Sequence, residues 1–458
     1  MSKPASVRWA LASLSLSMLM PSLDTSIANV ALPTLAHAFI ASFQAVQWIV
    51  LAYLLAITSL IVSVGRLGDI VGRRRLLLAG IWLFTAASLV CGVAPTLWLL
   101  IVARAAQGLG AAVMMALTVA LVGETVPTHH TGSAMGLLGT MSAIGTTLGP
   151  SLGGVLIAAF GWRVIFLVNV PLGLLNVVLA RRYLPVDRRE LTTESAGFDT
   201  MGTLLIGVTL GAYALAMTIG RGRFGVTNIG LAAAAIVGLG LFGLAETRAA
   251  SPLIRLSMFR NPVLSASLAM STLVSTVMMA TLVVGPFYLS GSLRLDTAVV
   301  GFVMSVGPLV AALTGVPGGR IVDRLGAQRM TIVGLVVMSA GCVLVAMMPT
   351  TLGITGYIAP IVVVTAGYAL FQAANNTAVM TDVRPDQRGA IAGLLTLSRS
   401  LGLITGASVM GAVFAHAGMR ITFVVAATLI VVALASAVGS RALKAPPAAF
   451  TLHQGASS

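Results

Sequence analysis

Residues 65–72 read GRLGDIVG, and residues 319–326 read GRIVDRLG. Both segments match the pattern G-R-x-x-D-x-x-G, and arginines follow each of them. The second segment begins 254 residues after the first, and each lies in a short polar loop behind a long apolar stretch. An internal repeat in the same position relative to the apolar stretches predicts a chain built from two related halves.

The composition places the chain in a membrane. Hydrophobic residues make up 58% of the sequence and charged residues 9%, and the mean hydropathy is +1.02. Apolar stretches of about 20 residues, the length that crosses a bilayer as a helix, alternate with short polar loops. These values exclude a soluble globular protein. We therefore expect an all-α polytopic membrane protein.

The apolar stretches predict fourteen transmembrane helices in two six-helix bundles plus two inserted helices. The predicted spans are 7–33, 45–64, 76–94, 98–123, 134–158, 164–180, 200–219, 227–245, 263–289, 298–317, 330–348, 355–380, 390–416 and 421–440. The corresponding domains are an N-terminal six-helix bundle at 1–184, a linker with the two inserted helices at 185–262, a C-terminal six-helix bundle at 263–445, and a cytoplasmic tail at 446–458.

The basic residues predict the orientation of the chain. The net charge is +15, and the termini and even-numbered loops hold twenty lysines and arginines, against five in the other loops. Because cytoplasmic loops are enriched in basic residues, we expect a multi-pass protein of the inner (plasma) membrane with both termini in the cytoplasm. This distribution explains the basic excess without a nucleic-acid partner. The two cysteines, Cys91 and Cys342, have no companion at ligand spacing, so no metal site is expected.

The repeated loops carry a family resemblance. Residues 65–75 resemble the signature loop of the major facilitator superfamily, and the chain as a whole most resembles its fourteen-helix drug:proton antiporters of the EmrB/QacA type. That resemblance implies the major facilitator fold. It also implies that the loops control conformation through Gly65, Asp69, Gly72 and Arg73 in the first copy and through Gly319, Asp323, Arg324 and Gly326 in the second. Ile70 departs from the family pattern, which usually has a basic residue there.

The fifth span contains a second motif, GTTLGPSLGG at residues 145–154. It resembles the antiporter motif of the same superfamily. Small residues four apart allow a neighbouring helix to approach closely, and a proline bends the helix by removing a backbone hydrogen bond. We expect a conformational role for Gly145, Gly149, Pro150, Gly153 and Gly154. Helix packing without such a role is the alternative.

Asp24 is the only acidic residue well inside a long apolar stretch. A carboxylate at membrane depth costs roughly 2.5–3.5 kcal/mol, so it needs a partner or a water-filled cavity. Arg104, in a segment that resembles the family pattern R-x-x-Q-G-x-G-A, lies about 10 Å from the outer end of its span, and Asp24 about 13 Å from the end of its own. We expect the two to pair and to carry a proton, since a guanidinium favours the ionised carboxylate whereas desolvation favours the acid. In the alternative, Arg104 extends to the membrane interface.

Further polar or flexible residues in the spans are candidates for a substrate cavity. They are Trp48, Tyr53, Gln107, Met114, Tyr368, Gln372, Asn375, Asn376 and Arg399. For the amides the alternative is hydrogen bonding between helices, and for the methionine it is packing. Arg399 either contacts substrate or stays paired to a backbone end.

The sequence thus predicts a secondary transporter. We expect it to export small amphipathic or drug-like molecules by alternating access, with the proton as coupling ion and no other cofactor. The alternative is a proton-coupled uptake symporter or a facilitator for a small metabolite. No nucleophile, base and metal set converges inside the spans, so an enzyme is not expected. The expected partners are the small-molecule substrate and the lipid bilayer, with the protein a monomer and a periplasmic adaptor left open.

Overall fold

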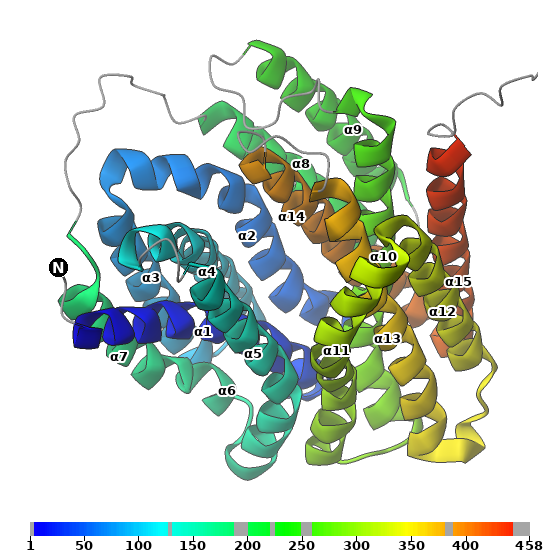
Figure 1. Ribbon diagram of the computed structural model, residues 1–458. Coiled ribbons are helices and arrows are strands. Elements are labelled where there is room, and N and C mark those ends of the chain that lie inside the picture. The colour runs from blue at the N-terminus through cyan, green and yellow to red at the C-terminus, as the bar shows by residue number, and fades with distance from the viewer. Residues whose placement is uncertain are drawn as a thin grey trace, which may run out of the picture.

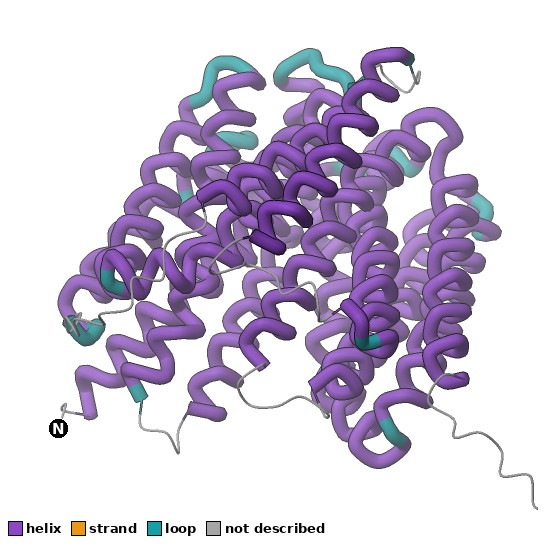
Figure 2. Tube along the Cα trace, turned by 90° about the horizontal axis from the view of Figure 1, so that it is seen from above, coloured by secondary structure: helices purple, strands orange, loops and turns teal. Residues whose placement is uncertain are grey.

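A computed structural model describes residues 4–126, 131–186, 200–219, 225–248, 259–380 and 388–442. Within these ranges every regular element is a helix, as Figure 2 shows. Parts of the predicted linker, at 187–199 and 249–258, and the whole predicted tail lie outside the described residues. The all-α prediction is confirmed for the part of the chain that is described.

The first half of the chain and the second half lie on opposite sides of the molecule (Figure 1). The helices of the first half are α1 (Pro4–Ala38), α2 (Phe43–Val71), α3 (Arg73–Val93), α4 (Leu97–Thr125), α5 (Thr131–Phe160), α6 (Val164–Leu167) and α7 (Asn169–Tyr183). Two helices follow, α8 (Thr200–Thr218) and α9 (Val226–Arg248). The second half contains α10 (Pro262–Phe287), η3 (Tyr288–Ser292), α11 (Thr297–Leu325), α12 (Ala327–Met347), η4 (Thr350–Leu352), α13 (Gly353–Met380), α14 (Arg388–Thr405), η6 (Gly406–Met410) and α15 (Gly411–Ala442).

Capping residues fix where several helices begin. The hydroxyls of Ser42 and Thr96 accept backbone N–H bonds at the first turns of α2 and α4, each at 3.3 Å. Asn261 does the same for α10 with two bonds, at 3.0 and 3.3 Å, and Pro262 occupies the first helical position. These are the residue types that satisfy or avoid the free N–H groups of a helix start.

Twelve stretches of the described chain are long and apolar enough to cross a membrane, so the predicted number of fourteen spans is not confirmed. The first predicted span is helical, as α1, but it is too polar to be among the twelve. The last two predicted spans fall in one stretch, Leu394–Gly439, which contains non-helical backbone at Gly418 with φ 71°.

The two copies of the repeat have the same backbone structure. Gly72 ends α2 with φ 102°, and Gly326 ends α11 with φ 89°. Each glycine N–H bonds to the carbonyl four residues earlier at 2.9 Å, and the next helix starts directly after it. Because this part of φ space favours glycine, the final glycine of the pattern forms the sharp corner between two membrane helices.

A second pair of equivalent contacts relates the halves. A Cβ on Gly110 would lie 2.8 Å from the carbonyl oxygen of Gly80, so α3 and α4 touch through their backbones. A Cβ on Gly367 would lie 2.8 Å from the carbonyl oxygen of Gly334, which brings α12 and α13 together in the same way. Gly80 and Gly334 are separated by the same 254 residues as the two motif loops.

The halves meet at one end of the bundle, which we call the aromatic end after Phe39, Phe43, Trp162, Phe287 and Phe414. Phe43 on α2 contacts both Phe287 of α10 and Phe414 of α15, with ring centroids 4.5 and 5.7 Å apart. At the same end Phe39 packs on Trp162 at 5.3 Å, and the Gln47 amide donates to the Ala407 carbonyl at 2.8 Å. Towards the other end, a Cβ on glycines of α2, α5 and α11 would meet nothing within 4 Å; these are Gly65, Gly136, Gly139, Gly315 and Gly319. These glycines face open space rather than a neighbouring helix.

Helix α8 lies along α2 and also reaches the second half of the chain. The Trp48 indole N–H donates to Thr218 at 3.1 Å, and Ser63 and Thr203 share a hydrogen bond of 2.5 Å, so α2 and α8 are tied near both ends. The Tyr213 hydroxyl of α8 donates to Thr405 of α14 at 3.1 Å. Helix α8 thus covers the side of the molecule on which α2 faces α14, and α9 packs on α8.

Candidate functional site

The structure brings Asp24 of α1 and Arg104 of α4 together. An Nη atom of Arg104 donates a hydrogen bond to the Asp24 carboxylate, and the two side chains form an ion pair. Asp24 is 2% exposed and Arg104 is fully buried. A buried ion pair is stable only when its remaining polar atoms also find partners, and the surrounding residues supply most of them.

Two amides complete the coordination of the carboxylate. The Gln107 side chain, one turn beyond Arg104, donates to Asp24 at 2.9 Å and to the hydroxyl of Ser88 at 2.8 Å. Its oxygen accepts from the Arg104 Nη at 2.7 Å. From α7, the Asn169 amide donates to the same Asp24 oxygen at 2.8 Å. Side chains of α4 and α7 therefore donate to the Asp24 carboxylate of α1, and Ser88 of α3 supports one of these donors.

The guanidinium of Arg104 is held inside the bundle. Its Nε donates to the Ile49 carbonyl of α2 at 3.1 Å, and its central carbon lies 4.2 Å from the centre of the Tyr53 ring. This orientation is the predicted pairing and differs from the alternative, in which the side chain extends to the membrane interface. One Nη atom of Arg104 has no hydrogen-bond partner among the described residues.

The glycines of the second motif place α5 directly on α1. A Cβ on Gly145 would lie 2.8 Å from the Leu19 carbonyl, and a Cβ on Gly149 would lie 2.3 Å from the Ser26 side chain. Gly153 continues the contact at Ile27. These α1 residues lie on either side of Asp24 in the chain, so α5 packs against the same part of α1 that carries the buried carboxylate.

The end of the same motif touches the other half of the molecule. A Cβ on Gly154 would lie 2.7 Å from the Thr297 carbonyl of α11, and a Cβ on Gly301 would lie 2.3 Å from the Pro150 carbonyl of α5. Next to the proline, the Ser151 backbone N–H donates to the Ser305 hydroxyl of α11 at 2.9 Å. Motif residues therefore contact α1 on one side and α11 on the other, which links the Asp24 helix to the second half.

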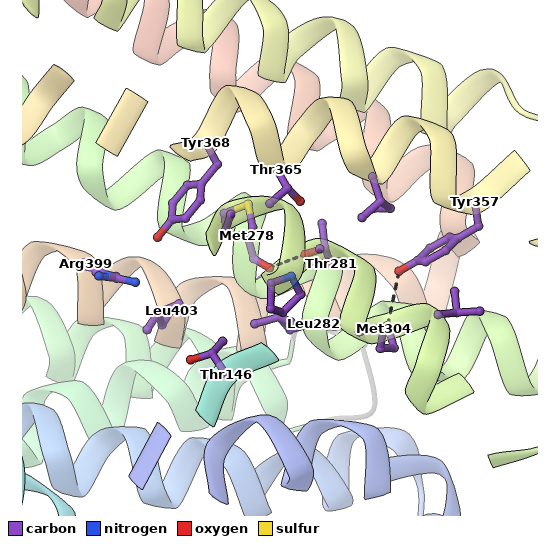
Figure 3. A pocket seen from close by; sticks show the side chains of 15 residues that line it. Thr146, Met278, Thr281, Leu282, Met304, Tyr357, Thr365, Tyr368, Arg399 and Leu403 are labelled. Carbon is purple, nitrogen blue, oxygen red and sulfur yellow. Dashed lines mark hydrogen bonds between the residues drawn. The ribbon is translucent and has the colours of Figure 1, made fainter. Parts of the chain in front are cut away.

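A cavity of about 130 Å³ lies among helices of the second half, and one residue of the first half also lines it. Helices α10, α11, α13 and α14 supply most of its walls, and Thr146 of α5 lines it from the first half (Figure 3). The lining side chains are Thr146, Met278, Thr281, Leu282, Val303, Met304, Gly307, Pro308, Ala311, Tyr357, Ile361, Thr365, Tyr368, Arg399 and Leu403.

Of the sequence-predicted cavity residues, Tyr368 and Arg399 are in this lining set. Gln107 and Tyr53 belong instead to the surroundings of Arg104, and Trp48 is bonded to α8. The remaining four lie elsewhere: Met114 is fully buried in the core of the first half, Gln372 donates to the Tyr368 hydroxyl at 3.1 Å, Asn375 is buried with its amide 3.4 Å from the Ser267 carbonyl, and Asn376 is exposed.

The loop residues of the repeat are described in part. The Asp69 side chain is outside the described residues, whereas Asp323 and Arg324 are exposed at the end of α11. Arg73 begins α3, and a Cβ on the nearby Gly68 would lie 2.8 Å from the Leu117 side chain of α4. The roles predicted for these loops remain predictions.

Sequence reasoning missed two members of the Asp24 network, Asn169 and Ser88. Asn169 is an amide inside an otherwise apolar stretch, FLVNVPLG at residues 166–173. An isolated amide at membrane depth needs a polar partner, and this signal could have identified it. Ser88 offers no such signal, because serine is common in membrane helices and readily bonds to its own backbone, as Ser88 also does with Phe84 at 2.7 Å.

The comparisons with known proteins identify the class. The Major Facilitator Superfamily profile matches residues 14–407, and the chain belongs to this family. It is 30% identical over 397 residues to the riboflavin transporter RibZ of Clostridioides difficile (strain 630), covering 87% of this chain and 86% of that protein. It is 32% identical over 412 residues to the multidrug resistance protein Stp of Mycobacterium tuberculosis (strain CDC 1551 / Oshkosh), covering 87% and 74%.

Solved structures show the same fold. A bacterial homologue of the human lysosomal transporter Spinster, in an inward-facing and unoccupied conformation, superimposes with a TM-score of 0.70 at 16% identity, covering 96% of this chain and 98% of that one. A D-xylose-proton symporter gives a TM-score of 0.70 at 15% identity, covering 94% and 97%. The protein is therefore a multi-pass membrane transporter that acts on small molecules, rather than an enzyme.

Proposed function

We propose that the protein is a proton-coupled exporter of small amphipathic molecules, in the manner of the fourteen-helix drug:proton antiporters. The observation that carries this proposal is the position of Asp24, buried on α1, the helix that Gly145, Gly149 and Gly153 of α5 contact. The relative named as a multidrug resistance protein supports drug-like substrates, and the relative named as a riboflavin transporter supports a ring-shaped organic substrate.

Fourteen spans follow if two corrections are applied to the count of twelve. Helix α1 is 35 residues long, more than enough to cross the bilayer at 1.5 Å per residue, and its polar residues face other helices. The stretch Leu394–Gly439 has 46 residues, twice the length that a single span needs, and it breaks at Gly418. With fourteen spans and the predicted positive-inside bias, both termini lie in the cytoplasm of a monomer in the inner membrane.

The same orientation assigns the conformation. The aromatic end carries the connection between α1 and α2, which lies outside the cell when the N-terminus is in the cytoplasm. Because the contacts described between the halves lie at this end, which is closed in an inward-facing transporter, the proposed conformation is inward-facing. Export then requires the seam between α5 and α11 to open outward.

Protonation of Asp24 offers a physical link to that seam. As a carboxylate, Asp24 holds the Arg104 guanidinium and the two amides of Gln107 and Asn169. A bound proton removes the charge that keeps these donors in place, so α4 and α7 lose part of their hold on α1. Helix α5 packs on the same segment of α1 and on α11, and a shift of α1 therefore alters the contact between the halves. One charge moved through the membrane potential supplies about 2.3 kcal/mol per 100 mV.

The test is transport by Asp24→Asn, which keeps the size of the side chain but cannot release a proton. In everted membrane vesicles energised by respiration, we expect the wild type to accumulate riboflavin and the variant not to accumulate it. Addition of a protonophore should abolish the wild-type signal. Asp296→Asn is the matched control, since Asp296 is exposed in the loop before α11 and should transport like the wild type.

Two outcomes would contradict the proposal. Full energised accumulation by Asp24→Asn would remove Asp24 as the proton carrier. Accumulation in energised whole cells but not in everted vesicles would reverse the direction and make the protein an uptake symporter.

A further inference from the structure

Arg399 carries a charge that the described protein leaves uncompensated. It lies eleven residues into α14, about 16 Å along the helix from Arg388. The side chain lines the cavity described above, and Arg399 is an exposed residue. Among the described residues, no hydrogen bond or ion pair involves its guanidinium. A cation at this depth is costly unless an anion or water meets it.

The cavity offers no acidic partner. None of its lining side chains is an aspartate or a glutamate. Asp24 is the one acidic residue in the middle of a described helix, and both of its oxygens are already used by Arg104, Gln107 and Asn169. The electrostatic potential in this cavity is therefore set by Arg399, and it favours an anion over a cation.

Tyr368 adds a neutral donor at the same end of the cavity. Its hydroxyl oxygen accepts from Gln372 at 3.1 Å, which leaves the hydroxyl hydrogen free to donate. In Figure 3 this hydroxyl points towards the end of the cavity where Arg399 lies. A guanidinium and a phenol hydroxyl together match the oxygens of a carboxylate, which accepts paired bonds from arginine.

The rest of the cavity is mostly apolar, although Thr146, Thr281 and Thr365 also line it. Met278, Leu282 and Met304 form its walls, and Tyr357 closes the far end with its hydroxyl turned to the Met304 sulfur at 3.6 Å. The volume of about 130 Å³ suits a body of one aromatic ring, since an engineered apolar cavity of roughly 150 Å³ takes up benzene.

We propose that this cavity binds a small organic anion, with its carboxylate at Arg399 and Tyr368 and a single-ring apolar body between Met278 and Met304. The inference rests on the proposed function in that the bound anion is one of the transported substrates. It names a class that the transporter fold leaves open, because a buried acid and a buried arginine would favour opposite charges.

Binding of radiolabelled salicylate to the purified full-length protein tests this inference. Salicylamide is the matched competitor, since it has the same ring and hydroxyl but an amide in place of the carboxylate. We expect salicylate to bind at least tenfold more tightly than salicylamide. Arg399→Gln should weaken salicylate about tenfold to a hundredfold, the range for one charged hydrogen-bonding partner, and leave salicylamide unchanged. Retained salicylamide affinity shows that the variant is folded.

Further variants sharpen the result. Arg399→Lys keeps the charge without the planar fork, and its affinity should fall between those of the wild type and Arg399→Gln. Tyr368→Phe should cost salicylate about tenfold. Arg420→Gln removes an exposed arginine of the same half that does not line the cavity, and it should bind salicylate like the wild type.

The inference is overturned if the wild type shows no saturable salicylate binding, if the two ligands bind equally, or if Arg399→Gln keeps the wild-type affinity for salicylate. No gradient is present in this assay. Selective binding together with failed transport in vesicles would therefore retain the anion site and reject proton-driven export, whereas the reverse result would reject only the anion site.

Discussion

Replacing Gly301 with alanine should disfavour the conformation in which the halves touch at the aromatic end. Gly301 lies on α11 where that helix crosses α5, and its Cα faces Gly154. A Cβ at this position would be 2.3 Å from the Pro150 carbonyl oxygen and 3.0 Å from the Gly154 Cα. Both contacts are with backbone atoms, so no side chain can rotate away to make room.

The size of the effect follows from these distances. An ordinary contact begins near 3.4 Å, so the two helices must separate by about 1 Å to accept the methyl group. Inserting a methyl group into a well-packed contact typically costs about 1–3 kcal/mol. A cost of this size, paid only while the seam is closed, lowers the ratio of closed to open molecules about 5-fold to 150-fold.

Spin labels across the seam measure this ratio. Cysteines introduced at Phe160, which is 71% exposed at the end of α5, and at the exposed Ser292 before α11 place one label on each half. The native Cys91 and Cys342 are fully buried and should not react. Pulsed electron–electron double resonance on the purified protein should show that the population with the longer distance between the two labels is larger in Gly301→Ala than in the wild type.

Gly315→Ala is the matched control on the same helix. A Cβ on Gly315 meets nothing within 4 Å, so this variant should have the wild-type distance distribution. The reasoning fails if Gly301→Ala leaves the distribution unchanged, or if Gly315→Ala shifts it by as much.

Two further predictions concern polar contacts. Arg104→Gln leaves the Asp24 carboxylate buried without its counter-charge, which should cost about 3–5 kcal/mol of folding stability and lower the melting temperature and the yield. Adding Asp24→Asn to this variant should restore stability but not transport. An Arg104→Gln variant as stable as the wild type would contradict the pairing. The Tyr213–Thr405 hydrogen bond joins α8 to α14. A double-mutant cycle of Tyr213→Phe and Thr405→Val in unfolding measurements should give a coupling energy near 0.6 kcal/mol, the usual value for such bonds in membranes. A coupling energy of zero would show that the bond contributes nothing to holding α8 in place.

The sequence predicted those parts of the site that rest on strong local constraints. A carboxylate and an arginine at matching depth in two spans have few ways to be satisfied, and the structure joins Asp24 to Arg104. The positive φ of Gly72 and Gly326, the last glycine of each motif copy, was not predicted and emerged from the structure. For the ion pair a single physical requirement, charge compensation, limits the outcome.

The cavity was harder to predict because amides satisfy themselves in several ways. Gln107 was expected at the cavity, yet it bridges Asp24, Arg104 and Ser88 in a closed network. Asn376 was expected there too, yet it is exposed. Which face of a span lines a cavity depends on the rotation of each helix in the bundle, and packing between helices sets that rotation rather than the sequence of one span.

The first helix shows why counting apolar stretches falls short in this protein. Helix α1 is not among the twelve because Ser13, Ser17, Asp24 and Asn29 replace apolar residues along it, and each of these is at most 2% exposed. Two of the serines bond to Asn176 of α7, at 2.7 and 2.8 Å, as Asp24 bonds to its own partners. Hydropathy measures the transfer of a helix into lipid, whereas α1 is enclosed by α4, α5, α7 and α10, whose polar groups bind Ser13, Ser17 and Asp24; Asn29 has no hydrogen-bond partner among the described residues. The polar residues that make α1 the centre of the proposed proton site are therefore also the residues that lower its mean hydropathy below that of the other membrane helices.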